Sequence, residues 1–286
     1  MRHFFLALFL ALISLPIFAL KTKDTASLRV MSYNIRYLNT IDSINVWDNR
    51  KDKVAGLINY HQADLIGVQE AVLSQIKDLE AKLPDFAWYG VGRMDGKEDG
   101  EFSAIYYRKS RFKLLDSGTF WYSETPNTPG SKSWDDYFPR MASWVKLKDK
   151  QTGRTFFHFN THYDHRGAFT REKSSEILVQ QTAAIAGKLP MLITGDFNTT
   201  ETSKPYQVLV NNTGLQDAKY ISQTPHYGPA GTSSGFWVKK TIRAKIDYIF
   251  VNKPVQVLQH AILTDQQDGR YFSDHLAVIA EVIISK

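Results

Sequence analysis

The sequence predicts a mixed α/β protein, built as a sandwich of mixed or antiparallel β-sheets covered by helices. Short β-rich runs alternate with segments of helical periodicity along most of the 286 residues. These runs outnumber the helical segments, and hairpin-length turns join many of them, as in antiparallel sheets. The chain also lacks the glycine-rich fingerprint of a dinucleotide-binding sheet or a P-loop. A Rossmann-like parallel sheet is therefore disfavoured.

The predicted strands are short runs rich in apolar, β-branched and aromatic residues, bounded by polar or turn residues. In chain order they cover residues 28–33, 65–69, 103–107, 142–148, 155–161, 191–194, 246–251 and 277–283. Three intervening segments carry apolar residues at helical spacing and are predicted helices, at 50–61, 72–83 and 171–188. No linker or low-complexity tract divides the chain after residue 28, so we expect one domain over 28–286.

The first nineteen residues are predicted to be a secretory signal. Arg2 and His3 precede an apolar run from Phe4 to Leu20, and Ala19 offers a small residue for cleavage. The run is too short, and too interrupted by proline, for a comfortable membrane span of about 20 residues. An uncleaved anchor is the alternative. We therefore expect an exported protein, periplasmic or secreted, without a stable membrane span.

Composition limits the chemistry that is available to this chain. Cysteine is absent, which excludes disulfide frameworks, thiolate zinc sites and cysteine nucleophiles. Any metal must therefore bind oxygen or imidazole ligands. The formal net charge of +6 suits a polyanionic partner, but basic exported proteins often bind no nucleic acid, so the charge carries little weight.

Polar side chains follow several of the predicted strands at the point where each strand ends. One such residue is more often a turn or helix cap than a ligand. Their recurrence at successive strand ends indicates a shared cleft, in which hard oxygen ligands and two histidines suit a Mg²⁺-dependent phosphoester hydrolase. The residues are Asn34, Glu70, His162, Asp196 and Asn198, with Asp274 and His275 before the last strand.

Asp247 is unusual because it lies inside an apolar run, between Ile246 and Tyr248. A carboxylate in such a run costs free energy unless it has a partner. The sequence therefore predicts a cation, a histidine or a metal beside it.

Six short motifs together resemble the endonuclease/exonuclease/phosphatase superfamily, which includes deoxyribonuclease I. They read MSYNIR at 31–36, QE at 69–70, NTHYD at 160–164, GDFN at 195–198, IDY at 246–248 and SDH at 273–275. Each motif is weak alone, but their order and spacing match the family. The resemblance implies a deoxyribonuclease I-like four-layer sandwich, two packed mixed sheets flanked by helices, with the active site at one rim.

The resemblance also implies roles for individual residues. Asn34 and Glu70 resemble the metal-binding pair, to which Asp274 adds a further candidate ligand, and the expected ion is Mg²⁺, with Mn²⁺ or Ca²⁺ as alternatives. Asp196 and Asn198 resemble the residues that orient the attacking water and hold a phosphate oxygen. His275 resembles the histidine that contacts the scissile phosphate.

Partners for the histidines follow from the same resemblance. Asp247 resembles the acid that orients His275, and Glu101 is expected to pair with His162. Arg36, Arg140 and Asp164 are candidates for substrate binding. Tyr137 and Phe138, in a loop flanked by glycine, proline and serine, are candidates for a substrate-contacting surface, as is Trp134.

The expected activity is hydrolysis of a phosphodiester by in-line attack of water, most simply by a nuclease. The alternatives are a phosphatase or a phospholipid or sphingomyelin phosphodiesterase on the same fold, and a non-catalytic binding protein. The motifs depart from the inositol 5-phosphatases, which carry a tryptophan before the GDxN motif where this chain has Ile193-Thr194. The expected partner is a phosphodiester substrate such as nucleic acid. We expect a monomer without a dedicated protein partner.

Overall fold

The computed structural model describes residues 26–238 and 240–285, so the predicted signal at 1–19 lies outside the described residues. The strands are β1 (Leu28–Asn34), β2 (Leu65–Ala71), β3 (Phe86–Tyr89), β4 (Phe102–Arg108), β5 (Phe112–Trp121), β6 (Met141–Asp149), β7 (Thr155–His162), β8 (Met191–Asp196), β9 (Leu215–Asp217), β10 (Asp247–Asn252), β11 (Val255–Ile262), β12 (Gln266–Gln267), β13 (Arg270–Tyr271) and β14 (Val278–Ile284). The helices are η1 (Thr40–Asn45), α1 (Trp47–Tyr60), α2 (Leu73–Lys82), α3 (Ala168–Ala186), α4 (Lys204–Val210) and α5 (Ala218–Ile221).

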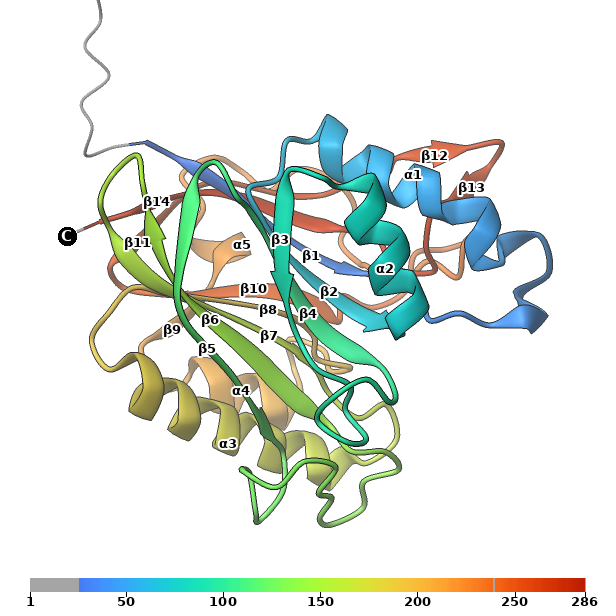
Figure 1. Cartoon of the computed structure of the whole chain (residues 1–286). Coiled ribbons are helices and arrows are strands. Elements are labelled where there is room, and N and C mark those ends of the chain that lie inside the picture. Colours follow the sequence, from blue (N-terminus) through green and yellow to red (C-terminus); the bar gives the residue numbers. More distant parts are fainter. Residues whose placement is uncertain (1–25, 239, 286) are drawn as a thin grey trace, which may run out of the picture.

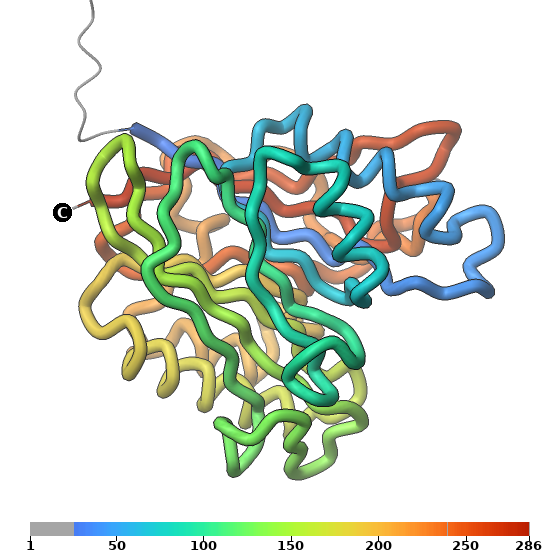
Figure 2. Tube along the Cα trace, viewed as in Figure 1, coloured from blue at the N-terminus to red at the C-terminus, as the bar shows by residue number. Residues whose placement is uncertain are grey.

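Most of the strands form two mixed six-stranded sheets. The first has the order β11-β14-β1-β2-β4-β3, and the second has the order β5-β6-β7-β8-β10-β9. Each sheet contains one parallel pair, β1 with β2 and β7 with β8, and its other pairs are antiparallel. A helix crosses over between the strands of each parallel pair, α1 in the first sheet and α3 in the second. The first and last strands of the described chain are neighbours, because β1 pairs with β14 (Figure 2).

The sheets pack face to face, with helices on their outer faces (Figure 1). Apolar side chains from both sheets, such as Val30 and Leu192, fill the layer between them. A second apolar cluster lies under α1 and α2, and a third packs α3 and α4 against the second sheet. Burial of both faces explains why the central strands read as apolar runs in the sequence. The predicted sandwich with four layers is confirmed.

A polar contact also joins the two sheets in their shared interior. Asn160 on β7 donates through Nδ2 to the carbonyl oxygens of Val68 and Ala104 in the opposite sheet, both at 2.9 Å. Its Oδ1 accepts from Gln69 Nε2 at 2.7 Å. Gly67 allows this close approach, since a Cβ there would lie 2.4 Å from Asn160 Oδ1. These bonds satisfy the buried amide and tie the sheets together at one register.

The predicted elements agree with the structure in type. Every strand and helix expected from the sequence overlaps an observed element of the same kind. The third predicted helix, α3, ends at Ala186 and is followed by Gly187, whose φ of +57° lies in the left-handed region that favours glycine. Within the described part of the chain, the helices are all too short or too polar to cross a membrane.

Candidate active site

The predicted site residues converge at one rim of the sandwich, at the carboxyl ends of the parallel strand pairs. Asn34 ends β1 and Glu70 lies near the end of β2, while His162 and Asp196 end β7 and β8. The antiparallel neighbours of these strands begin at the same rim. They bring four further predicted residues, Glu101 before β4, Arg140 before β6, Asp247 at the start of β10 and His275 before β14.

Glu70 owes its position to an irregularity in β2. The pairing of β2 with β4 shifts register between Val68 and Ala71, and Glu70 adopts a φ of +66°. A bulge of this kind re-aims a side chain, and a positive φ at a non-glycine residue marks a locally constrained backbone. The carboxylate accepts from the backbone N–H of Tyr37 through Oε2 at 2.9 Å. It therefore lies fixed at the rim.

Asn34 links the carboxylates of the two sheets. Its Nδ2 donates to Glu70 Oε1 at 2.9 Å and to Asp196 Oδ2 at 3.0 Å, and its Oδ1 accepts from the backbone N–H of Arg36 at 2.9 Å. Burial and the charge of Glu101 raise the pKa of Glu70, but the cationic His275 and the hydrogen bond from this amide hold it below its ordinary value. Asn34 thus lies beside Glu70 as predicted, but its amide group braces the two carboxylates.

His275 and Asp247 meet across the two sheets. The Nδ1–H of His275 donates to Asp247 Oδ2 at 2.9 Å, and Asp196 Oδ2 lies 3.9 Å from the same nitrogen. Burial opposes protonation, but Asp247 and Asp196 outweigh it and raise the pKa of His275 well above its ordinary value. The ring is therefore cationic and can stabilise an anion in the pocket.

His162 and Glu101 also approach each other, but less closely. The distance from His162 Nδ1 to Glu101 Oε2 is 3.6 Å, beyond a normal hydrogen bond, while Arg93 Nη1 donates to the same oxygen at 2.7 Å. Burial, together with the charge of Arg140, lowers the pKa of His162 to about 3. His162 is therefore neutral, and Arg93 is the closer partner of Glu101.

Asp196 and Asn198 lie together as the GDxN motif predicts. Asp196 Oδ1 accepts from the backbone N–H of Asn198 at 2.9 Å, and Asn198 adopts a φ of +48°. The Asn198 Nδ2 donates to the carbonyl oxygen of Tyr163 at 3.0 Å. Burial and the neighbouring Asp247 raise the pKa of Asp196 above its ordinary value. A carboxylate shifted in this direction is better able to accept a proton from water.

The predicted substrate residues divide into two groups. Arg36 and Arg140 line the pocket, although Asp42 holds Arg36 by two hydrogen bonds of 2.9 and 3.0 Å. Asp164 does not line it. This carboxylate is fully buried, and its Oδ1 accepts from the backbone N–H groups of Arg166 and Gly167, both at 2.7 Å. The expectation that Asp164 contacts substrate is corrected, because it caps the turn before α3.

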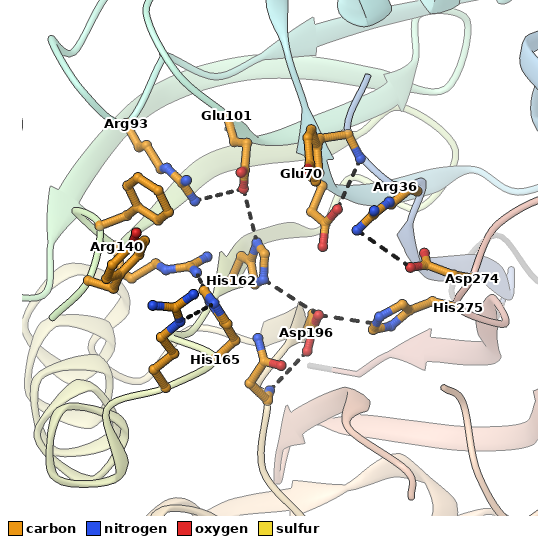
Figure 3. A pocket seen from close by; sticks show the side chains of 15 residues that line it. Arg36, Glu70, Arg93, Glu101, Arg140, His162, His165, Asp196, Asp274 and His275 are labelled. Atoms are coloured by element: carbon orange, nitrogen blue, oxygen red, sulfur yellow. Dashed lines mark hydrogen bonds and ion pairs between the residues drawn. The ribbon is translucent and has the colours of Figure 1, made fainter. Parts of the chain in front are cut away.

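These residues surround a pocket of about 510 Å³ (Figure 3). It is lined by Arg36, Tyr37, Glu70, Arg93, Glu101, Tyr137, Phe138, Arg140, His162, His165, Arg166, Asp196, Asn198, Asp274 and His275. Tyr137 and Phe138 take part as the loop composition predicted, whereas Trp134 lies in another hollow. Arg93 and Arg166 are additions to the predicted set. No strand or motif marks Arg93 in the sequence, and only its contact with Glu101 identifies it.

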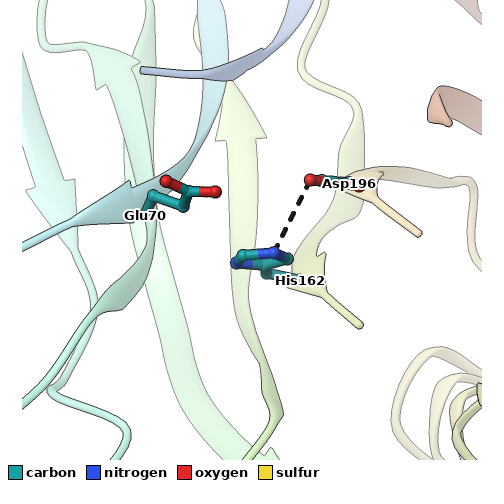
Figure 4. Close-up of side chains that lie close together, drawn as sticks. All are labelled: Glu70, His162 and Asp196. Atoms are coloured by element: carbon teal, nitrogen blue, oxygen red, sulfur yellow. Dashed lines mark ion pairs between the residues drawn. The ribbon is translucent and has the colours of Figure 1, made fainter. Parts of the chain in front are cut away.

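The rim offers two donor sets with the chemistry of a divalent-metal site. Oxygen and nitrogen atoms of Glu70, His162 and Asp196 lie within 4.8 Å of one another (Figure 4), as do those of Asp196, Asp247 and His275. The first set faces the pocket and combines two carboxylates with a neutral imidazole, which fits Mg²⁺ or Mn²⁺. Asp274, a predicted ligand, lines the same pocket, with its Oδ2 3.8 Å from Arg36 Nη1.

Comparisons with known proteins agree with this geometry. A protein of the endonuclease/exonuclease/phosphatase family from Bacteroides thetaiotaomicron is 37% identical and superposes with a TM-score of 0.88, covering 92% of this chain and 99% of that one. A mannosyl-6-phosphatase from the same organism is also 37% identical, with a TM-score of 0.87 and coverages of 90% and 99%. Human nocturnin is 24% identical over 259 residues, 82% of this chain, and the chain spans 58% of nocturnin's length.

A family model described as the endonuclease/exonuclease/phosphatase family matches residues 31–275. This range contains all of the motifs and every residue of the rim described above. The chain therefore belongs to the endonuclease/exonuclease/phosphatase family, whose members hydrolyse phosphoester bonds.

Proposed function

We propose that the protein is a metal-dependent phosphatase that hydrolyses a phosphomonoester of a small, sugar-like molecule. The pocket carries this proposal, because its volume of about 510 Å³ falls in the range that encloses small ligands. Its lining combines aromatic side chains, Tyr137 and Phe138, with the polar Asp274 and His275. The 37% identity with a mannosyl-6-phosphatase over 90% of this chain supports a sugar phosphate as the substrate class.

The metal would bind to Glu70, Asp196 and His162, with Asn34 bracing the two carboxylates. We propose Mg²⁺, with Mn²⁺ or Ca²⁺ as alternatives, because carboxylate oxygens dominate the donor set. When bound, the ion supplies positive charge that stabilises the oxygens of the phosphoryl group.

The remaining steps belong to side chains of this protein. Asp196 lies where its carboxylate can orient the attacking water molecule. His275, held by Asp247 and cationic, donates to a phosphate oxygen and stabilises the charge that develops there. Asn198 lines the same end of the pocket, where its amide can hold a second phosphate oxygen.

A nuclease is the second candidate. The net charge of +6 and the four arginines that line the pocket would favour a polyanion such as nucleic acid. Against it, a pocket of about 510 Å³ suits a small ligand better than an extended nucleic-acid strand. Export, a monomeric state and the lack of a protein partner stay predictions from the sequence.

The two candidates separate by substrate. We would incubate the purified protein with Mg²⁺, Mn²⁺ or EDTA and with mannose 6-phosphate, p-nitrophenyl phosphate, bis-p-nitrophenyl phosphate, sphingomyelin, DNA or RNA. The proposal expects metal-dependent release of phosphate from the two monoesters, with kcat/KM at least about tenfold above that for the diesters. Cleavage of nucleic acid without turnover of a monoester would establish the nuclease instead, and no turnover of any substrate would contradict an enzymatic role.

Variants test whether turnover comes from this rim. Glu70→Gln and His275→Asn should abolish most of it, because they remove the proposed metal ligand and the cationic donor. Glu281→Gln is the matched control, since this carboxylate lies opposite Arg29, near the other end of β1. Retained activity in Glu70→Gln would show that the turnover comes from a contaminant or from another site.

A further inference from the structure

We propose that an arginine wall of the pocket, formed by Arg93, Arg140 and Arg166, binds a second anionic group of the substrate. The preferred substrate would then be a phosphomonoester that carries another negative charge, such as a second phosphate or a carboxylate. This inference rests on the proposed phosphatase function, because it concerns the same pocket.

The arginine wall and the proposed phosphate site lie at different ends of the pocket. Figure 3 shows Arg93, Arg140 and His165 on one side of His162, and Asp274 and His275 on the other. A scissile phosphate beside His275 therefore leaves the arginine wall free for another group of the same molecule. The wall is assembled from three segments, since Arg93 precedes β4, Arg140 precedes β6 and Arg166 follows β7.

The arginine wall has more positive charge and more N–H donors than its neighbours use. Glu101 pairs with Arg93 at 2.7 Å, and Asp164 Oδ2 lies 3.6 Å from Arg140 Nε. Arg166 makes no ion pair with any described residue. Arg140 is only 3% exposed, and within the described residues its Nε and Nη1 have no hydrogen-bond partner. Arg140 therefore places at the pocket lining a positive charge whose hydrogen-bonding capacity its neighbours do not fill.

His165 gives an independent reason to expect an anion. Arg140 Nη2 lies 3.0 Å from its Nδ1, and Arg166 Nε lies 3.2 Å from its Nε2. A guanidinium can only donate, and a neutral imidazole has only one nitrogen that accepts. One of the two contacts therefore places an N–H group against another N–H group. An oxyanion beside His165 would supply an acceptor to the arginine that is left without one.

Aromatic rings hold two of these guanidinium groups in place. Arg93 lies over the ring of Phe138, with 4.7 Å from Cζ to the ring centroid, and Arg166 lies over Tyr137 at 4.0 Å. The two rings pack edge to face, with centroids 4.6 Å apart. Stacking leaves the edges of the guanidinium planes free for bidentate contacts with a phosphate or carboxylate. Less side-chain entropy is then lost when the anion binds.

The test measures binding, so it does not depend on turnover. By calorimetry in EDTA, we would compare fructose 1,6-bisphosphate with fructose 6-phosphate, and 6-phosphogluconate with glucose 6-phosphate. The first pair adds a phosphate and the second adds a carboxylate. We expect the doubly anionic member of at least one pair to bind about tenfold more tightly, as one charge-assisted contact predicts. Equal affinities within both pairs would overturn the inference.

Arg166→Ala locates the effect. Arg166 is exposed and its removal leaves the buried residues intact, so folding should be unaffected, unlike the case of Arg140→Ala. The preference should fall below about threefold in Arg166→Ala and be intermediate in Arg166→Lys, which keeps the charge but loses the bidentate geometry. Lys113→Ala is the control, because it also removes one positive charge but lies at the start of β5, outside the pocket lining. It should preserve the preference. A preference unchanged in Arg166→Ala would also overturn the inference.

Turnover of the same sugar phosphates then separates the two proposals. If the wild-type protein hydrolyses a monophosphate but does not distinguish it from a doubly anionic substrate in binding, the phosphatase proposal stands and the arginine wall does not. If it binds doubly anionic sugars through Arg166 but releases no phosphate from any of them with Mg²⁺ or Mn²⁺, the binding inference stands and the phosphatase proposal fails.

Discussion

The rim contains two histidine–carboxylate couples that the fold builds in related ways. They differ in protonation, because His275 is cationic and His162 is neutral. In one couple the second sheet supplies Asp247 and the first sheet supplies the segment of His275. In the other the first sheet supplies Glu101 and the second supplies His162. The two carboxylates also have equivalent places in their sheets. Asp247 begins β10, which runs antiparallel to β8, and Glu101 directly precedes β4, which runs antiparallel to β2.

Their surroundings account for the difference. Asp247 accepts from His275 at 2.9 Å, and no arginine competes for it within the hydrogen bonds and ion pairs of the described chain. Glu101 instead accepts from Arg93 at 2.7 Å and lies 3.6 Å from His162. The pKa of His275 is raised and that of His162 is lowered to about 3 by burial and nearby arginines. Topology therefore places each couple, and the balance between burial and the neighbouring charges decides whether its histidine is protonated.

The largest effect should come from the couple whose histidine, His275, is cationic. His275→Asn keeps a hydrogen-bonding side chain but cannot carry a charge, so kcat on the best phosphoester substrate should fall by about 10²–10³-fold, as when one preorganised donor is lost. Steady-state kinetics at saturating Mg²⁺ measure it. A loss under about tenfold would mean that the charge of His275 is not used.

Asp247→Asn should lower kcat by about 10–100-fold and change its pH dependence. His275 must be protonated, so activity is lost as the pH rises through its pKa, which Asp247 raises. Removing that carboxylate lowers the pKa, and the alkaline limb of the pH–rate profile should move to lower pH. Glu101→Gln is the matched comparison and should leave the alkaline limb in place. An identical shift in both variants would contradict the assignment of charge to one couple.

A third histidine, His158, shows the effect of burial on a histidine pKa without a carboxylate partner among the described residues. His158 on β7 is fully buried, its Nε2 contacts Thr194 Oγ1 at 2.9 Å, and burial lowers its pKa from 6.5 to about 3. Because the unfolded chain takes up this proton and the folded chain does not, the stability that it contributes is present above pH 6.5 and is lost as the pH falls.

Urea unfolding at pH 7 and pH 5 measures this loss. The wild-type protein should lose about 2 kcal/mol more unfolding free energy between the two values than His158→Gln does. Equal losses in the two proteins would mean that His158 titrates normally in the folded state. Circular dichroism at pH 7 would first establish that the variant keeps the fold.

The smallest effect should come from removing Arg93, the hydrogen-bond partner of Glu101. Arg93→Met removes a buried positive charge, so the pKa of His162 should rise toward its ordinary value, and kcat/KM should fall by less than about tenfold. Titration of the His162 ring by NMR in metal-free protein measures the pKa directly. An unchanged pKa would mean that burial and Arg140 keep His162 neutral without Arg93. Arg270→Met, at the short β13 strand, serves as the control.

The sequence predicts the central strands well and the edge strands poorly. The predicted runs correspond to strands inside the two sheets, which are buried on both faces and therefore apolar. The strands it missed include all four edges, β3, β5, β9 and β11. In β5, Lys113 and Asp116 interrupt the apolar pattern, since one side of an edge strand faces water and charged residues discourage further pairing.

The site shows a similar division. Residues at strand ends, such as Glu70 and Asp196, are predictable because the sheet fixes where a strand ends. Arg93 and Arg166 lie in irregular segments, where contacts depend on the path of a loop and leave no periodic signal. Asp164 follows the NTH motif closely, but the turn after β7 directs its carboxylate toward backbone N–H groups. Local sequence does not reveal this direction.

The amide of Asn160 has a consequence for how this protein can change over evolution. Because it joins β7 to carbonyl oxygens of β2 and β4, sliding of one sheet over the other would break buried hydrogen bonds. The spacing of Glu70 and Asp196, which lie on opposite sheets, is thus set in the interior and does not depend on the rim loops. Substitutions and insertions in the 122–140 segment can therefore alter which alcohol is accepted while the hydrolytic centre keeps its dimensions.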